Sequence, residues 1–426
     1  MEFRTAKSVD RWLGIPACFM LSAFETAKVF FSSHVDKRLP DPKKILFIGL
    51  SEIGSNVLAY GAIKTAREMF PGARLYFSTF EENREILEIL GVAGAGDVFT
   101  IRSGNFGTLF ADTVRFFRSV RREKIEAVVD MELFSRYSAI LTYLSGAAVR
   151  VGFHGYAVGG LYRGDFFTHQ VQFNQHKHIS ENFIALVKAI QADPSDKPLL
   201  KENFSACGNE PPRLDAAPSS ADRIFEKLRS EKAEISRRDR IVVLNPEVRT
   251  RLPLRSWPVQ SYRDLAERLL TLPDVFVVVI GLGESNPACD IQHDRYINMT
   301  GKTSLRDLVD LFHVSRVMVS HDSGAVHLAS LTDMETVVLF GPETPLLYGP
   351  LRGRHRIVSR DLFCSPCLSS FNHRTSACRN NQCMKSITAA EVFEIVKGKL
   401  DGMPAGEVCA AMLTKTVSGG FLPERG

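Results

Sequence analysis

The sequence predicts an α/β protein built from two doubly wound domains with parallel sheets. Three observations indicate this class. Short apolar strands alternate with helix-length segments along most of the 426 residues, an alternation typical of parallel sheets. The strands end in turns rich in glycine and polar residues, and the alternation fades once, in the Pro-, Asp-, Ser- and Ala-rich stretch 194–222. A chain of this length is expected to divide into two or three units.

The first domain is predicted over residues 43–193. Lys44–Leu50 is an apolar strand that ends in a glycine turn, and Asn56–Phe70 has helical spacing that stops at a Pro-Gly pair. The pattern then repeats, with strands near 74–79, 127–131 and 150–153 and helices near 82–90, 108–123, 136–145 and 182–192. These elements predict a Rossmann-like unit.

A linker with a charged connecting helix is predicted over 194–238, and a second Rossmann-like domain over 239–400. The strands of this second domain are expected at 240–244, 275–280, 296–299, 317–320 and 336–340, and its helices at 261–271, 304–312 and 325–331. Ligands of open α/β sheets bind outside the carboxyl ends of the strands, so the two domains are expected to face one cleft. The polar, Gly-rich tail 401–426 is predicted to be disordered.

Residues 1–42 are predicted to form a separate amphipathic segment. Large apolar side chains between Val9 and Phe31 are interrupted by four charged residues, Asp10, Arg11, Glu25 and Lys28. The uninterrupted apolar run is too short to span a bilayer, and no export cleavage site is clear. Two alternatives remain: a helix in the membrane interface, or a helix packed on the protein's own surface. We expect a cytoplasmic protein, peripheral on the inner membrane under the first alternative.

Composition excludes one class of partner. The hydrophobic share of 45% and the charged share of 24% are ordinary for a globular protein, and the net charge is only +5. No basic stretch is interleaved with stacking aromatic residues, so we do not expect binding to nucleic acid.

The most informative stretch is Arg316–Pro350, which predicts a buried strand, a polar turn, a helix and a second strand. Asp322, Ser323 and Gly324 lie in the turn, and His327 follows one helical turn later. A helix N-terminus attracts anions, and Gly324 lets a phosphate approach the backbone. We expect Asp322 to cap the helix and His327 to face the same anion site at the N-terminus of the helix. The alternative is a capped α/β crossover without a ligand.

These residues also resemble a known family. Asp322-Ser323-Gly324, then His327-Leu328-Ala329, and then Phe340-Gly341-Pro342 with Thr344-Pro345 look like the signature of the heptosyltransferase-type glycosyltransferases, family 9 with the GT-B fold. Further similarities occur in the family's order, at residues 44–54, Asn245-Pro246, Arg255-Ser256-Trp257-Pro258 and 301–305. The similarity spans residues 43–395, and its second half is the more specific.

The resemblance implies a GT-B protein with two Rossmann-like domains and an inverting, metal-independent glycosyltransferase activity. A heptose-like sugar would move from a nucleotide-diphospho-sugar to a lipid-linked or lipopolysaccharide-type saccharide. ADP-heptose is the usual donor of the family. No cofactor would be required for catalysis, and domain closure over the donor would exclude water.

Several residues are candidates for donor binding besides the turn. Arg255 stands where the family holds a basic residue on the donor phosphates, which suits bidentate arginine chemistry, with Arg249 and Arg251 as alternatives. Glu284 follows the Gly281-Leu282-Gly283 turn and suits a ribose hydroxyl. Lys302 resembles a family position near the nucleotide.

The general base is where the chain departs from the family. Heptosyltransferases generally have Gly-Asp in the first strand-to-helix loop, and here the pair is Gly54-Ser55. A neutral hydroxyl is too weakly basic to replace a carboxylate. We favour Glu132, at the end of a strand, slightly over Glu52, in the same loop. His154 is a weaker third candidate.

Four of the eight cysteines lie within twenty residues of one another: Cys364, Cys367, Cys378 and Cys383. Two close pairs of this kind can hold a structural zinc ion, although the spacing is not that of a standard finger. Free thiols or disulfides are the alternatives, and disulfides would need an oxidising compartment.

Two other functions remain open. The missing Asp favours a non-catalytic nucleotide- or glycan-binding protein that kept the donor domain, whereas the carboxylates Glu52 and Glu132 favour an enzyme. A sugar-nucleotide epimerase or hydrolase with the same fold would act on the donor alone. A dehydrogenase is not expected, since no G-x-G-x-x-G motif follows the first strand.

Overall fold

The computed structural model describes residues 3–402 except 32–40, 51, 95, 156–160, 203, 205–207, 209, 233, 247–251, 284–290 and 371; the side chains of residues 3–7 are not described. The chain forms two compact units. Unit 1 comprises Met1–Pro212, Glu343–Arg352 and Pro366–Cys378, and unit 2 comprises Arg213–Pro342, Gly353–Ser365 and Arg379–Gly426. The sequence prediction differs, because it assigned residues 239–400 wholly to the second domain and gave 1–42 a domain of their own.

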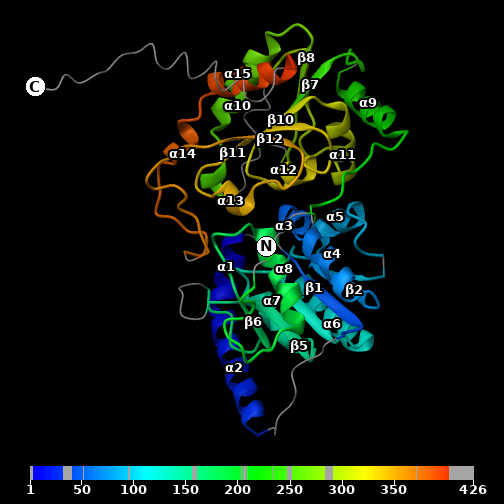
Figure 1. Cartoon of the computed structure of the whole chain (residues 1–426). Helices are drawn as coiled ribbons and strands as arrows, with labels where there is room; N and C mark the ends of the chain where they lie inside the picture. The colour runs from blue at the N-terminus through cyan, green and yellow to red at the C-terminus, as the bar shows by residue number, and fades with distance from the viewer. Residues whose placement is uncertain are drawn as a thin grey trace, which may run out of the picture. The chain divides into compact units, whose positions relative to one another are not determined.

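Unit 1 is a six-stranded parallel sheet covered by helices (Figure 1), and its strands run in the order β3-β2-β1-β4-β5-β6. Its strands are β1 Lys44–Ile48, β2 Arg74–Phe80, β3 Val98–Ile101, β4 Ala127–Asp130, β5 Val149–His154 and β6 His169–Gln172. Its helices are α1 Phe3–Trp12, α2 Gly14–Phe31, α3 Ile53–Leu58, α4 Tyr60–Met69, α5 Arg84–Ile89, α6 Phe106–Glu123, α7 Arg136–Leu144, α8 Ile179–Lys188 and, from the later segment, α13 Pro345–Tyr348.

Unit 2 repeats this topology, with the strand order β12-β11-β10-β7-β8-β9. Its strands are β7 Arg240–Asn245, β8 Val275–Val279, β9 Tyr296–Asn298, β10 Val317–His321, β11 Glu335–Leu339 and β12 Arg354–Val358. Its helices are α9 Ser220–Glu231, α10 Val259–Leu270, α11 Leu305–Val314, α12 Gly324–Ala329, α14 Gln382–Lys385 and α15 Ala389–Leu400. The prediction of two doubly wound parallel sheets is confirmed.

Both sheets have a topological switch point, where the strand order reverses. In unit 1 it lies between β1 and β4, which pair in register from Ile45 with Ala127 to Ile48 with Asp130. In unit 2 it lies between β7 and β10, which pair up to Asn245 with Ser320. The connections leave the sheet in opposite directions at such a point, so the loops part and leave room for a ligand at the carboxyl ends of the strands.

The hydrophobic core explains why these segments form strands. Ile45, Leu46, Phe47 and Ile48 of β1 and Val275–Val279 of β8 are buried on both faces of their sheets, as continuous apolar runs in parallel sheets are expected to be. The outermost strands β3, β6 and β12 have a partly polar composition, such as HQVQ in β6, and the sequence analysis did not predict them.

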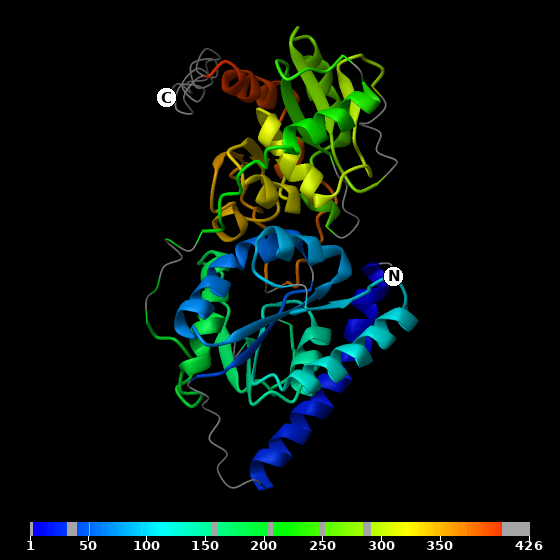
Figure 2. The same cartoon turned by 90° about the vertical axis from the view of Figure 1, so that its right-hand side faces the viewer.

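Helix α2 covers a part of the first sheet that has no crossover helix in the described residues. Strands β5 and β6 are parallel neighbours, yet the described part of the segment between them contains no helix. Helix α2 packs beside α7, where Cys18 joins a buried cluster with Ala139, Phe166 and Phe167. Packing on the protein's own surface, one of the two alternatives from the sequence, is thus observed, and the N-terminal helices are part of unit 1 (Figure 2).

Asp112 joins α6 to the end of β3. Its carboxylate accepts hydrogen bonds from the Arg102 backbone N–H at 3.0 Å and from Arg102 Nε and Nη2 at 2.8 and 2.9 Å, and Arg115 adds a contact of 2.7 Å. The hydrogen bonds from Arg102 lower the pKa of Asp112 to about 2, from an ordinary value of 3.8. The folded pKa lies below the unfolded one, so these contacts stabilise the fold above about pH 4 and lose their effect as the pH falls towards 2.

We therefore expect Asp112→Asn to lower the free energy of unfolding at pH 7 and to remove part of the acid dependence. In urea titrations from pH 7 downwards, the variant should approach the wild type near the pKa of about 2. A difference that stays constant across this range would contradict the assignment.

Candidate active site

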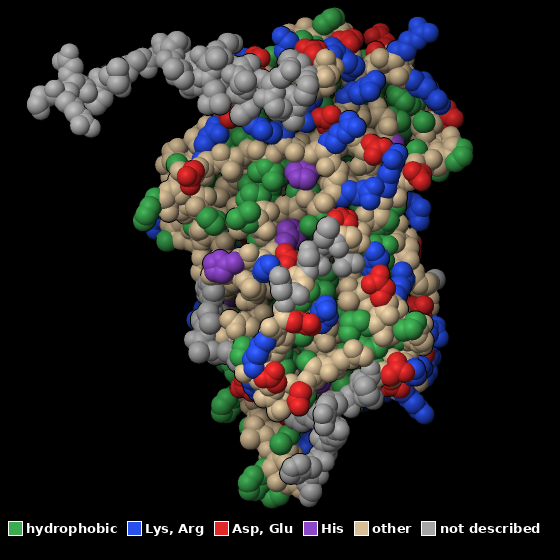
Figure 3. All heavy atoms as spheres, viewed as in Figure 1, with side chains coloured by type: hydrophobic (Ala, Val, Ile, Leu, Met, Phe, Trp, Pro, Cys, Tyr) green, Lys and Arg blue, Asp and Glu red, His purple; other side chains and the backbone are tan. Residues whose placement is uncertain are grey.

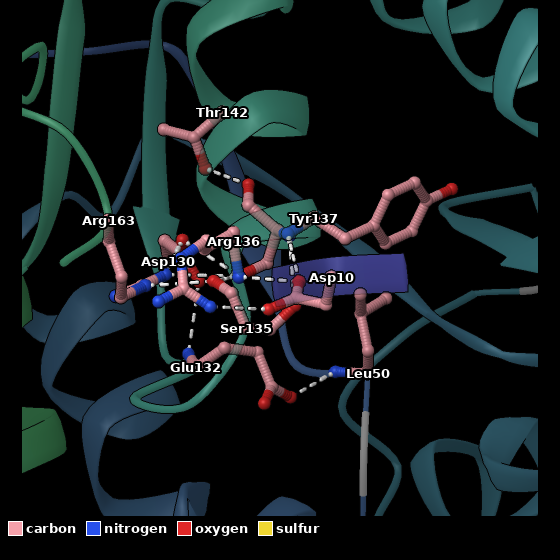
Figure 4. A network of polar contacts seen from close by, with 10 residues as sticks. Asp10, Leu50, Asp130, Glu132, Ser135, Arg136, Tyr137, Thr142 and Arg163 are labelled. Carbon is pink, nitrogen blue, oxygen red and sulfur yellow. Dashed lines mark hydrogen bonds and ion pairs between the residues drawn. The ribbon is translucent and has the colours of Figure 1, made fainter. Parts of the chain in front are cut away.

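The switch point of unit 1 brings the two predicted base candidates together. Glu132 follows β4 and is largely buried, and its Oε1 accepts a hydrogen bond of 2.7 Å from the Leu50 backbone N–H beyond β1 (Figure 4). Glu52 lies two residues further along the same loop, at the N-cap of α3. Both glutamates line one small cavity of about 50 Å³, together with Ser55 and Asn56.

A buried ion pair supports the loop that holds Glu132. Asp130 Oδ1 accepts a hydrogen bond of 3.0 Å from the Glu132 backbone N–H, and Oδ2 contacts the Arg163 guanidinium and, at 3.1 Å, Ser138 Oγ. Arg163 Nε also donates to the Ser135 carbonyl at 2.9 Å (Figure 4). Burial raises the pKa of Asp130 to about 6, against the opposing charge of Arg163. The sequence analysis did not identify these two positioning residues.

Arg374 enters the same cavity from far along the chain. Its guanidinium lies 3.0 Å from Glu343 Oε1 and 3.6 Å from Glu52 Oε1, and it stacks over the rings of Tyr348 at 4.7 Å and Phe134 at 5.1 Å. All five residues belong to unit 1. Burial raises the pKa of Tyr348 to about 12, so its hydroxyl stays protonated at neutral pH.

A larger cavity of about 610 Å³ adjoins the small one, and Leu133 lines both. Polar side chains on its wall come from the ends of β5 and β6 and the segments that follow them: His154, Arg163, Gln172, Asn174, Gln175 and His176. Phe153, Phe173 and Phe204 supply apolar surface. His154, the third base candidate, lies here beside Asp165 at 2.8 Å and does not line the small cavity.

At the switch point of unit 2, the side-chain amide of Asn245 forms hydrogen bonds with the predicted turn. Asn245, the last residue of β7, donates to Ser320 Oγ at 3.1 Å and to Ser323 Oγ at 3.0 Å. Ser323 is the N-cap residue of α12, and no side-chain hydrogen bond caps that helix. Helix α12 has only six residues, close to the length of the predicted helix 325–331.

Asp322 does not cap the helix, contrary to the prediction. Its Oδ2 instead forms an ion pair of 2.9 Å with Arg255, which also donates to the Asp322 carbonyl at 2.8 Å. Both side chains are about nine-tenths buried. The structure thus joins two predicted donor-binding residues that are far apart in sequence, and the guanidinium of Arg255 contacts both the side chain and the backbone of Asp322.

The Trp-Pro motif explains how Arg255 is positioned. Trp257 is buried, donates from Nε1 to the Ile387 carbonyl at 2.8 Å and packs edge-on against Tyr262 at 4.8 Å. The Tyr262 hydroxyl in turn accepts from the His321 backbone N–H at 3.0 Å. Both ends of the Arg255–Asp322 pair are therefore fixed to one aromatic cluster.

The other predicted donor residues have different surroundings. His327 is buried in α12, beside Gly324 in the first turns of that helix. Lys302 pairs with Glu231 of α9 at 2.5 Å. Glu284, Arg249 and Arg251 lie outside the described residues.

The four clustered cysteines are free thiols in the structure, with Cys364 exposed and Cys383 buried. Cys367 and Cys378 belong to unit 1, and Cys364 and Cys383 to unit 2. Within the part of the chain that the structure describes, no three His, Cys, Asp or Glu side chains gather as a metal site requires. The geometry therefore gives the predicted zinc ion no support.

Comparison with known proteins agrees with this geometry. A sequence model of glycosyltransferase family 9 (heptosyltransferase) matches residues 113–376, more than half of the chain. The chain belongs to glycosyltransferase family 9. The match includes Glu132, Arg255 and Asp322, whereas Glu52 lies before it, and it supports the resemblance drawn from the turn at Asp322.

Curated relatives of this family 9 chain are lipooligosaccharide heptosyltransferases 2. The Haemophilus influenzae protein is 24% identical over 199 residues, which are 42% of this chain and 57% of that protein. The Campylobacter jejuni serotype O:2 protein is 25% identical over 153 residues, which are 34% of this chain and 47% of that protein. In these alignments the chain spans about half the length of the relatives. The Haemophilus ducreyi protein aligns at 22% identity over 72% of this chain and 86% of that protein.

Solved structures show that the family 9 fold is shared. The Escherichia coli ADP-heptose LPS heptosyltransferase II superposes with a TM-score of 0.62 at 19% identity, covering 84% of this chain and 98% of the other. The family 9 glycosyltransferase of Veillonella parvula gives 0.64 at 16% identity, with 87% and 99% covered. The predicted GT-B fold class is confirmed.

Proposed function

We propose that this protein is an inverting glycosyltransferase that moves a heptose-like sugar from ADP-heptose to a lipid-linked saccharide of the lipopolysaccharide type. Family membership supports the reaction class, and the names of the relatives support the donor and acceptor classes. The observation on which the proposal mainly rests is that Glu52 and Glu132 line one cavity at the switch point of unit 1. The family's base is expected in this loop, and here a serine replaces it.

The chemistry would be a single displacement. The acceptor hydroxyl attacks the anomeric carbon, the bond from that carbon to the diphosphate oxygen breaks, and the configuration inverts. A carboxylate takes the hydroxyl proton, and Glu132 is our first choice because the Leu50 N–H fixes its orientation. The nucleoside diphosphate leaves with both electrons of the broken bond, so nearby hydrogen-bond donors and positive charge stabilise the transition state.

In unit 2 the turn at Asp322, Ser323 and Gly324 would bind the diphosphate. Arg255 would compensate its charge from behind the turn, and Ser323 and His327 would offer polar contacts. We keep Lys302 and Glu284 as candidate contacts to the nucleoside. The donor-binding role of these residues rests on the family resemblance and on the Arg255–Asp322 pair.

In unit 1 the cavity of about 610 Å³ would bind the acceptor saccharide. Its volume lies in the range of ligand-binding cavities, roughly 300–1,000 Å³. Carboxamide and imidazole groups beside phenylalanine rings suit a sugar, whose hydroxyls need donors and acceptors and whose C–H faces need apolar contact. The cavity adjoins Glu132 through Leu133, so a hydroxyl of a bound saccharide could reach the base.

The proposed acceptor places the reaction on the cytoplasmic side of the inner membrane, where nucleotide sugars and lipid-linked glycans meet. We propose no cofactor for catalysis. A structural zinc ion on Cys364, Cys367, Cys378 and Cys383 stays a prediction, and metal analysis of the purified protein would test it.

One observation favours a second candidate function. Ser55 stands where the family generally has its Asp, and a chain without a base would bind a nucleotide sugar or a glycan without turning it over. Substrate assays separate the two. The purified protein is incubated with ADP-heptose and a lipopolysaccharide core acceptor, with ADP-heptose alone, and with UDP- and GDP-sugars.

We expect ADP release only with ADP-heptose and acceptor together, and a glycosylated product of matching mass. Release without acceptor would indicate a hydrolase. Thermal stabilisation by ADP without any release would favour the binding protein, because a ligand at a hundred times its Kd stabilises by about 2.7 kcal/mol.

Arg374→Gln tests which glutamate takes the proton. The guanidinium lies 3.6 Å from Glu52, and a nearby positive charge favours an ionised carboxylate. If Glu132 is the base, as we expect, the fall of kcat/KM at low pH (the acid limb of the pH profile) occurs at the same pH in Arg374→Gln as in the wild type. A limb that moves to higher pH in Arg374→Gln, and stays in place in Arg374→Lys, would assign the base to Glu52.

A further inference from the structure

Helix α2 exposes its large phenylalanine side chains and buries a stripe of small and polar residues. The residues of α2 that face unit 1 are Gly14, Cys18, Ser22 and Glu25, a stripe three or four residues apart. Large side chains point outwards, among them Phe19 at 67% exposure, Phe24 at 63% and Phe30 at 84%. A surface helix normally has the opposite arrangement, with its apolar face towards the core.

One ion pair on α2 fixes this orientation, and a second one holds the preceding helix α1 on the protein. Glu25 Oε1 accepts from Arg150 Nη2 of β5 at 2.7 Å, with both side chains buried, and the Tyr143 hydroxyl contacts Glu25 Oε2 at 3.2 Å. At the start of the helical segment, Asp10 forms an ion pair of 3.1 Å with Arg136 and accepts from two backbone N–H groups of α7 (Figure 4). Rotating α2 to bury its phenylalanines would separate the buried charges of Glu25 and Arg150.

The charges on the helical segment are sorted by sign. The acidic residues Asp10 and Glu25 face the protein, whereas the basic residues Arg11 and Lys28 are exposed. The outward surface of the described residues 8–31 is therefore apolar with positive charge and without an acidic residue. An anionic phospholipid bilayer is complementary to such a surface.

The extent of the apolar surface also favours a bilayer. Ser8–Phe31 contains 18 residues that are apolar enough for a membrane-spanning helix, with a mean hydropathy of 1.3, and only 22% of these residues are buried against the protein. In two perpendicular views the end of α2 projects beyond the rest of unit 1, and Figure 3 shows hydrophobic side chains at that end. A partner in a groove would cover one side of the helix, whereas a bilayer interface can take up its whole projecting part.

We propose that α2 is a membrane anchor that stays folded on unit 1 and inserts its outward phenylalanines into an anionic bilayer, with Arg11 and Lys28 at the headgroups. This inference goes beyond the proposed transfer reaction and does not depend on it. The ion pairs with Arg136 and Arg150 keep the helix on the protein, so the anchor lies in one leaflet and does not cross the membrane.

Vesicle flotation of the purified full-length chain tests the proposal. The probes are phosphatidylcholine vesicles with and without phosphatidylglycerol. We expect the wild type to float with the anionic vesicles, and Phe19→Ser/Phe24→Ser to lose about a hundredfold in partitioning, since each buried phenylalanine contributes about tenfold. Lys28→Glu should weaken binding to anionic vesicles only.

The matched control is Phe106→Ser/Phe110→Ser on α6 of the same unit, where both side chains are similarly exposed, at 52% and 72%. This variant should float like the wild type. All variants should keep the wild-type thermal midpoint and the activity on a soluble acceptor, because the altered side chains lie outside the core and the site.

Several outcomes would overturn the inference. The wild-type protein could fail to bind vesicles and instead form a dimer that Phe19→Ser/Phe24→Ser disrupts in light scattering. This result would assign the exposed apolar face of α2 to contact with a second copy of the chain. An equal loss of vesicle binding in the α6 control variant would mean that exposed phenylalanines bind vesicles non-specifically wherever they lie. Membrane-bound protein that resists alkaline extraction would mean that α2 leaves unit 1 and spans the bilayer.

Discussion

Replacing Glu132 by glutamine is expected to lower kcat by about 10²- to 10⁴-fold, the usual contribution of a general base. Glutamine keeps the side-chain length and an oxygen that can accept the hydrogen bond of 2.7 Å from the Leu50 N–H, so the fold and the small cavity should survive. The amide cannot take a proton at neutral pH. KM for the donor should change little, because the variant removes an interaction that matters only in the transition state.

The controls decide between the two glutamates. Glu52→Gln, beside Arg374, should cost less than tenfold if Glu132 is the base, and Glu81→Gln, on the surface of unit 1, should have no effect. If both single changes are mild and the double change is severe, the two carboxylates substitute for each other. Full turnover in the double variant would refute the base assignment and leave the binding-protein function as the better proposal.

Replacing Arg255 by glutamine should have the largest effect in unit 2. Asp322 would lose the guanidinium at 2.9 Å while remaining buried, and breaking one side of a buried ion pair costs about 3–5 kcal/mol. Unfolding in urea should show this loss at pH 7. Thermal stabilisation by ADP should disappear as well, because the turn loses the positive charge behind it.

The double variant Arg255→Gln/Asp322→Asn separates the two effects. Removing both charges relieves the uncompensated carboxylate, so part of the lost stability should return. Stabilisation by ADP should not return, because the guanidinium is still missing. If ADP stabilises this double variant as it does the wild type, Arg255 has only a structural role and the donor-binding proposal for the turn is wrong.

The sequence analysis predicted the parts of the site that depend on local pattern. Apolar runs followed by polar turns predicted β1, β4, β7 and β10, and these strands meet in pairs at the two switch points. Parallel strands end at the same sheet edge, so residues just after them come close together whatever their sequence separation. This is why Glu52 and Glu132, which were predicted singly, line one cavity, and why Arg255 and Asp322, also predicted singly, lie in contact.

The parts that the sequence analysis missed depend on tertiary contacts with no local signature. Arg374 lies in an irregular segment among the cysteines, and nothing in its neighbours indicates that it stacks between Tyr348 and Phe134. Asp130 and Arg163 form their ion pair across two loops. Asp322 was expected to follow the helix-capping preference of its residue type, but the pair with Arg255 prevailed because both groups are buried.

The sequence analysis did not predict which face of α2 is exposed, for a related reason. Periodicity predicts which side chains of a helix share a face, but it does not indicate which face packs on the protein. Here the buried salt bridge with Arg150 decides the orientation, and an arginine within an apolar strand is not by itself a signal for such a partner.

The return of Glu343–Arg352 and Pro366–Cys378 to unit 1 has a consequence for synthesis on the ribosome. Domains generally fold as they emerge, starting from the N-terminus, and the first six strands are complete by Gln172. The small cavity with Glu52 and Glu132 nevertheless lacks Tyr348 and Arg374 until most of unit 2 has been translated. The first domain to emerge is therefore finished only after most of the second has been made, and a nascent chain that stops at Pro212 has both candidate bases without the residues that enclose them.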